Sequence, residues 1–146
     1  MFFAELPTWV LSQAHLRAHS ILTAKLVAVG ARVYDHRILD VLDRNPEPLS
    51  QVGIGTLARL DRRDVTLTLT TLEEEGYVVR RPDPDDARRN VVELTPEGRE
   101  RQRLLAALAA DAQEDVLAPL DADARGAFLG ALALLAGSRS LLGTEA

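Results

Sequence analysis

The chain has 146 residues, of which 47% are hydrophobic and 27% charged, values typical of a single globular domain with an ordinary core. It contains no cysteine, which excludes disulfides, thiolate metal sites and thiol redox switches. The start of the chain lacks the basic region of a signal peptide, and no segment is long and apolar enough to span a bilayer, so we expect a cytoplasmic protein without a membrane partner.

Helical patterns dominate both ends of the chain. Residues 8–29 contain no internal proline or glycine and repeat apolar side chains at helical spacing, and residues 33–44 show a second apolar face. Thr95 is a good N-cap with proline directly after it, which predicts a helix running towards Leu117. Asp121 can cap a last helix.

These outer helices are rich in alanine and leucine. Such apolar surface is hard to bury within one small subunit, which favours an obligate homodimer. A self-contained monomeric bundle is the alternative.

The centre of the chain has a different pattern. Residues 50–57 can form a short helix, in which Gly55 would let a second helix cross closely. A turn at Ala58 and Arg59 follows, and then Asp61 can cap the next helix. This succession predicts a helix-turn-helix.

The second of these central helices is predicted over residues 62–75, with Gly76 as its stop. Its buried stripe consists of Val65, Leu69 and Leu72. The outward face holds no acid, because the glutamates are confined to the last turn, and it carries groups that can contact phosphates, base edges or a thymine methyl group. These outward residues are Arg62, Arg63, Thr66, Leu67 and Thr70.

A β-hairpin is predicted next, with strands at 77–81 and 91–94 around a charged, turn-rich tip. The tip carries Arg88 and Arg89. A hairpin with arginines at its tip, directly after a helix suited to DNA reading, is typical of a wing that enters the minor groove. The fold class we expect is therefore mainly α with a small β-hairpin wing: a winged helix-turn-helix with N- and C-terminal dimerisation helices.

Four segments, in this order and spacing, together resemble the MarR family of bacterial regulators. They are Leu60-Asp61-Arg62-Arg63-Asp64-Val65-Thr66, Leu72-Glu73-Glu74-Glu75-Gly76-Tyr77-Val78, Arg80-Arg81-Pro82-Asp83-Pro84-Asp85-Asp86-Ala87-Arg88 and Leu94-Thr95-Pro96-Glu97-Gly98. The flanking helices also match in number and length.

The resemblance implies a homodimer on a pseudo-palindromic operator of double-stranded DNA. It implies that Asp86 and Arg88 form the D-x-R wing motif, in which the arginine reaches the minor groove and the aspartate holds it. It also implies a repressor released by a small, often aromatic, ligand. We expect residues 1–32 and 99–146 to form the dimerisation region and residues 33–98 the DNA-binding region of one intertwined domain.

Two positions depart from the family pattern. Arg59 stands where the turn usually has glycine, so a positive φ there would be strained. Leu67 stands where polar or basic residues are common, which leaves the base preference open.

Aromatic and imidazole groups suit planar acidic ligands, and they suggest candidates for an effector pocket. These candidates are Trp9, His15, His19, Tyr34 and His36. Alternatively, Trp9 and Tyr34 simply pack the dimer. The four-residue spacing of His15 and His19 can bind zinc, but no clear third ligand accompanies them, so we expect no metal and no cofactor.

The sequence contains no recognisable phosphate-binding loop, nucleophile motif or catalytic triad, and we expect no enzymatic activity. The expected function is that of a DNA-binding repressor or regulator. Two alternatives remain: a DNA-binding regulator without an effector, and a helical protein-interaction module that has lost DNA binding.

Overall fold

A computed structural model describes residues 1–137 of the chain. Its elements are a short 3-10 helix η1 (Phe3–Glu5), then α1 (Pro7–Val27), α2 (Val33–Arg44), β1 (Leu49–Ser50), α3 (Gln51–Ala58), α4 (Arg62–Glu74), β2 (Val78–Pro82), β3 (Asn90–Leu94), α5 (Pro96–Leu117) and α6 (Ala122–Leu135). The fold is mainly helical with a small antiparallel sheet, as expected.

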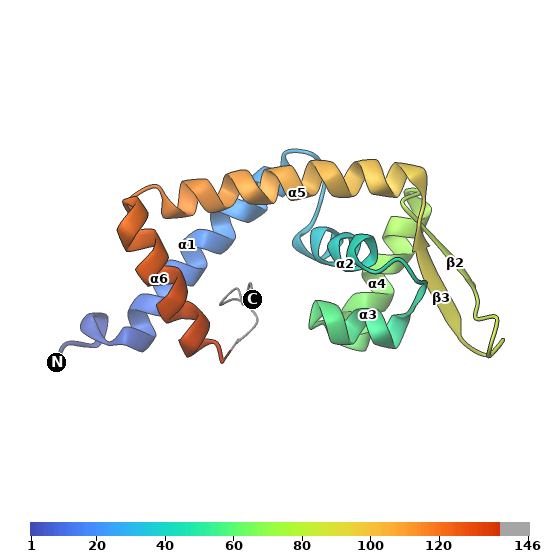
Figure 1. Cartoon of the computed structure of the whole chain (residues 1–146), viewed down its shortest axis with the longest axis horizontal. Coiled ribbons are helices and arrows are strands. Elements are labelled where there is room, and N and C mark those ends of the chain that lie inside the picture. The colour runs from blue at the N-terminus through green and yellow to red at the C-terminus, as the bar shows by residue number, and fades with distance from the viewer. Residues whose placement is uncertain (138–146) are drawn as a thin grey trace, which may run out of the picture.

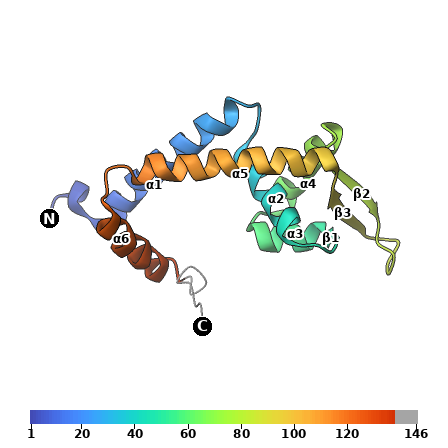
Figure 2. The ribbon, with the colours of Figure 1, turned by 45° about the horizontal axis from the view of Figure 1, so that its top comes forward.

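The long helix α5 organises the molecule (Figure 1). It runs from the hairpin at one end towards α6 at the other, with α1 packed along it. Helices α2, α3 and α4 gather beside the sheet, under the end of α5 that the hairpin leads into. In the turned view of Figure 2 the β2–β3 hairpin still projects beyond the helices.

Side-chain caps begin the helices where the sequence predicts them. Asp61 accepts a hydrogen bond from the backbone N–H of residue 64 at 2.8 Å, and Thr95 and Asp121 do the same for residues 98 and 124 at 2.9 Å. These bonds satisfy backbone donors that have no partner inside the helix. At the other end of α4, Gly76 has the positive φ of 81° that a helix stop favours.

The sheet differs from the predicted two-stranded hairpin, because it has three strands in the order β1-β3-β2. The added strand β1 is two residues long and pairs Leu49 with Val92 and Ser50 with Val91. It fastens the start of α3 to strand β3 of the hairpin, so the hairpin and the helix-turn-helix share one hydrogen-bonded frame.

A single apolar cluster holds these elements together. Its fully buried members come from α1, α2, α3, α4, both hairpin strands and α5: they are Leu26, Ile38, Leu39, Ile54, Val65, Leu69, Leu72, Val78, Val92 and Leu105. The predicted stripe of α4 lies in this core. Gly98 allows α5 to start close against the hairpin, because a Cβ there would lie 1.9 Å from the carbonyl oxygen of Tyr77.

Candidate DNA interface

Helices α3 and α4 form a helix-turn-helix with a close crossing. A Cβ on Gly55 would lie 3.1 Å from the carbonyl oxygen of Leu60 and 3.4 Å from a methyl group of Val65, so the missing side chain sets the approach. Arg59 closes α3 in the left-handed conformation, with φ 52° and ψ 51°. Arg59 therefore adopts the positive φ that is strained for a residue with a side chain.

The outward face of α4 carries the predicted contact residues. Arg62, Arg63, Thr66 and Leu67 are exposed, while Thr70 is half-buried. Neither Arg62 nor Arg63 forms an ion pair with any described residue. The first two turns of α4 therefore present two free guanidinium groups on one side of the molecule.

A polar network that the sequence reading missed supports this face from behind. The guanidinium of Arg80 donates to the hydroxyl of Thr70 at 3.0 Å and to the side-chain oxygen of Gln51 at 3.4 Å. Its Nε pairs with Glu73 at 3.3 Å, and its side chain is only 18% exposed. One arginine thus joins β2, α3 and α4 and neutralises an acid of the last turn of α4. The alternation of a strand was the available signal, because Arg80 shares a face with the buried Val78.

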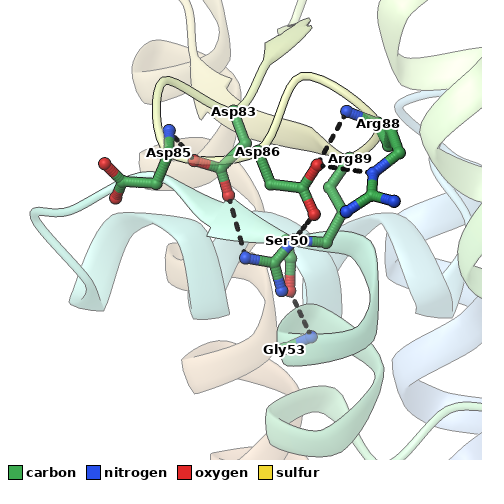
Figure 3. A network of polar contacts seen from close by, with 7 residues as sticks. All are labelled: Ser50, Gly53, Asp83, Asp85, Asp86, Arg88 and Arg89. Atoms are coloured by element: carbon green, nitrogen blue, oxygen red, sulfur yellow. Dashed lines mark hydrogen bonds and ion pairs between the residues drawn. The ribbon is translucent and has the colours of Figure 1, made fainter.

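The hairpin tip is held by its own acidic side chains (Figure 3). The carboxylate of Asp86 accepts hydrogen bonds from the backbone N–H of Arg88 at 3.1 Å and from its Nε at 3.2 Å. The pKa of Asp86 lies below its ordinary value, first because of this backbone N–H and then because of the Arg88 side chain. The carboxylate therefore stays ionised and orients the arginine.

The two arginines of the tip have different environments. Arg89 pairs with Asp83 at 3.4 Å and with Asp86 at 3.8 Å, so it braces the loop. The side chain of Arg88 is 91% exposed, and its two terminal nitrogens have no hydrogen-bond partner among residues 1–137. Arg88 is thus the arginine that projects from the tip with donors to spare.

Within residues 1–137, the ring contacts do not gather the effector candidates into one cluster. Trp9 packs edge-on against Phe3, and the rings of His15 and His19 stack at 5.9 Å on the exposed side of α1. Tyr34 lies on α2 beneath the guanidinium of Arg37. None of these ring contacts joins α1 to α2.

His36 differs from the other candidates because it is half-buried on α2. Its Nδ1 is buried without a hydrogen-bond partner in the described part of the chain. Burial lowers its pKa, an effect that nearby Asp40 opposes and that Arg37 and Arg44 reinforce.

Within the described residues, no group of three or more potential ligands is placed to hold a metal ion. Over the same residues, no helix is long and apolar enough to cross a membrane.

Comparison with known proteins agrees with this geometry. Residues 32–89, which hold the helix-turn-helix, strand β2 and the hairpin tip, match the sequence profile of the MarR family. A curated protein of Thauera aromatica, named as a transcriptional regulatory protein for the hcr operon, is 30% identical over 115 residues. The match covers 79% of this chain and 66% of that protein, just under two thirds of its length.

Two solved structures extend the likeness over nearly the whole chain. One is the transcriptional repressor CouR of Rhodococcus jostii RHA1 bound to a 23-mer DNA duplex, with 30% identity and a TM-score of 0.81 over 91% of this chain and 94% of that one. The other is the PcaV transcriptional regulator of Streptomyces coelicolor with its natural ligand, with 28% identity and a TM-score of 0.79 over 94% and 96%. The chain belongs to the MarR family of transcriptional regulators, and its fold is that of a DNA-binding regulator rather than of an enzyme.

Proposed function

We propose that the protein is a homodimeric, sequence-specific repressor that binds a pseudo-palindromic operator in the cytoplasm. One observation carries this proposal. The arginines on α4 that form no ion pair, and the exposed Arg88 on the projecting hairpin tip, belong to elements that β1 holds together. Two cationic elements at a fixed separation suit a helix in the major groove and a wing in the adjacent minor groove.

The proposed DNA contacts are divided between the two elements. On α4 they are Arg62, Arg63, Thr66, Leu67 and Thr70. On the wing, Arg88 enters the groove while Asp86 and Arg89 hold the tip in shape.

The dimer is proposed from the apolar surface left open at the other end of the molecule. Large apolar side chains are exposed along η1, α1 and α6, and they include Phe2, Phe3, Leu6, Trp9, Val10, Leu11, Leu16, Leu129, Leu134 and Leu135. A large exposed apolar patch on a globular protein commonly marks an interaction surface, and α1 keeps these side chains exposed although it packs along α5. We assign residues 1–32 and 99–146 to dimerisation and residues 33–98 to DNA binding.

We further propose control by a small aromatic ligand at the junction of the two regions. Support comes from the ligand-bound relative PcaV and from the rings of Trp9, His15, His19, Tyr34 and His36, which dimerisation would have to bring together. A thermal-shift screen of phenolic acids tests this, because a ligand of the native state raises the unfolding midpoint. A regulator without an effector would show no shift with any of them.

Binding to the DNA upstream of the protein's own gene, measured at several salt concentrations, tests the main proposal. A steep fall of affinity with salt is expected, since each phosphate contact releases counterions. Arg88→Ala should weaken binding by about 5- to 100-fold if this side chain reaches the groove. Weak binding that neither salt nor Arg88→Ala changes would support a protein-interaction module instead.

A further inference from the structure

We propose that Leu67 is a specificity-determining residue that reads the C5-methyl group of a thymine in the major groove. This inference rests on the proposed DNA-binding function and names the base chemistry that α4 recognises. The outward face of α4 offers a base edge few free hydrogen-bond donors and one large apolar side chain.

Three hydroxyl groups of α4, those of Thr66, Thr70 and Thr71, are already occupied as donors. Thr66 donates to the carbonyl oxygen of Arg62 at 2.8 Å, and Thr70 donates to that of Thr66 at 2.9 Å. Thr71 does the same towards residue 67 at 3.2 Å. A hydroxyl has a single proton to give, so none of these threonines can donate to guanine or to the O4 of thymine without breaking a bond of its own.

The acceptor side of these hydroxyls is also partly filled. Thr70 accepts a hydrogen bond from Arg80 at 3.0 Å, and Thr66 accepts one from Gln51 at 3.4 Å. The network behind the face therefore holds the threonines in place. Polar base reading by this face is left mainly to Arg62 and Arg63.

Leu67 is the group that remains at the centre of the face. Its side chain is 57% exposed, and it lies one helical turn after Arg63, on the same side of α4. The methyl group of thymine is the distinctive apolar group that base pairs display in the major groove. Since the arginines beside Leu67 suit phosphates and would repel a second copy of the same face, a thymine methyl is the occupant that the charges favour.

The experiment uses duplexes that the full-length protein selects from a random-sequence pool. Each thymine of a selected duplex is replaced in turn by deoxyuridine, which removes only the methyl group. We expect replacement at one thymine position of each half-site to weaken binding by about fourfold per half-site, the effect of one methyl group that is no longer removed from water.

Protein variants then assign the effect to a side chain. Leu67→Ala and Leu67→Gln should both bind thymine and deoxyuridine duplexes equally well at that position. Leu57→Ala, which truncates an exposed leucine of α3, should keep the discrimination. Because the Leu67 side chain is exposed, both of its variants are expected to keep the thermal midpoint of the wild type.

The outcomes separate this inference from the function on which it rests. Tight, salt-sensitive binding that no deoxyuridine replacement affects would overturn the role of Leu67 and leave the DNA-binding function intact. Discrimination that survives in both Leu67 variants would also overturn it, because another group would then read the methyl. If no duplex is selected at all, both proposals fail.

Discussion

The left-handed conformation of Arg59 is a local strain within the helix-turn-helix. For a residue with a Cβ this conformation costs about 1–2 kcal/mol, and glycine avoids that cost but loses more entropy on folding. Arg59→Gly is therefore expected to raise the free energy of unfolding by about 1 kcal/mol, measured by urea denaturation at fixed protein concentration. Arg59→Ala removes the guanidinium but keeps the Cβ, so it should leave stability nearly unchanged. An equal gain in both variants would mean that charge, not backbone strain, is being relieved.

His36 is the residue that should make stability depend on pH near neutrality. Burial holds its pKa below the ordinary value of 6.5, so the unfolded chain binds the proton more readily than the folded one. Stability is then complete above pH 6.5 and falls as the pH drops from there towards the lower pKa of the folded state.

The prediction for His36 is tested by urea unfolding between about pH 7.5 and about pH 5.5. His36→Gln should reduce the loss of unfolding free energy that the wild type shows over this pH range. His19→Gln, which removes an exposed imidazole, serves as the control and should retain that loss. A wild-type stability that rises as the pH falls would contradict the assigned direction.

At the scale of elements, a variant of the wing can separate two roles of Asp86. Its charge and its positioning of Arg88 predict opposite changes in DNA affinity. Asp86→Ala removes a negative charge from a DNA-facing tip, which by simple electrostatics would tighten binding. Because Asp86 orients Arg88 through two hydrogen bonds, we expect weaker binding instead, by roughly fivefold and less than for Arg88→Ala.

Asp85→Ala is the matched control for this prediction. It removes the same charge one position away, from a carboxylate that accepts no hydrogen bond within the described residues, so binding should stay unchanged or tighten slightly. Fluorescence anisotropy with a labelled operator at fixed salt measures all three variants. Equal tightening by Asp85→Ala and Asp86→Ala would show that Asp86 does not position the wing.

The elements that could be predicted from sequence are those with local signals. Thr95 with its following proline and Asp61 mark helix starts through bonds made within three residues, so α5 and α4 begin where expected. The strand β1 escaped prediction because it consists of Leu49 and Ser50 alone and exists only by pairing with β3, some forty residues later. The same limit applies to Arg80, whose partners Gln51, Thr70 and Glu73 come from α3 and α4.

At the scale of the whole molecule, α5 connects the proposed dimerisation region with the proposed DNA-binding region. Its twenty-two residues span about 33 Å, from the base of the wing to the end where α6 begins. Lys25 of α1 pairs with Asp111 at 2.5 Å and Asp115 at 2.9 Å, and Arg125 of α6 pairs with Glu114 at 2.8 Å. These ion pairs fix α1 and α6 to the far half of α5, so the proposed dimer surface and the DNA face are carried by one helix.

Disrupting the proposed dimer surface should therefore strongly weaken operator binding without touching the DNA face. Leu16 is exposed on α1, which packs along α5 rather than on α4, and Leu16→Asp would place a charge within the proposed interface. Light scattering should show a mass near 15.9 kDa for this variant, against roughly twice that for the wild type. Its affinity should drop to that for a single half-site, because two half-sites one helical turn apart must be engaged by linked subunits.

Leu57→Asp makes the same change at an exposed leucine of α3, outside the residues assigned to dimerisation, so it controls for the added charge and should remain dimeric. A Leu16→Asp protein that stays dimeric would move the interface away from this part of α1. A monomeric Leu16→Asp protein that still bound the full operator with wild-type affinity would show that each chain reads DNA alone. In that case dimerisation at one end of α5 would not be coupled to DNA binding at the other end.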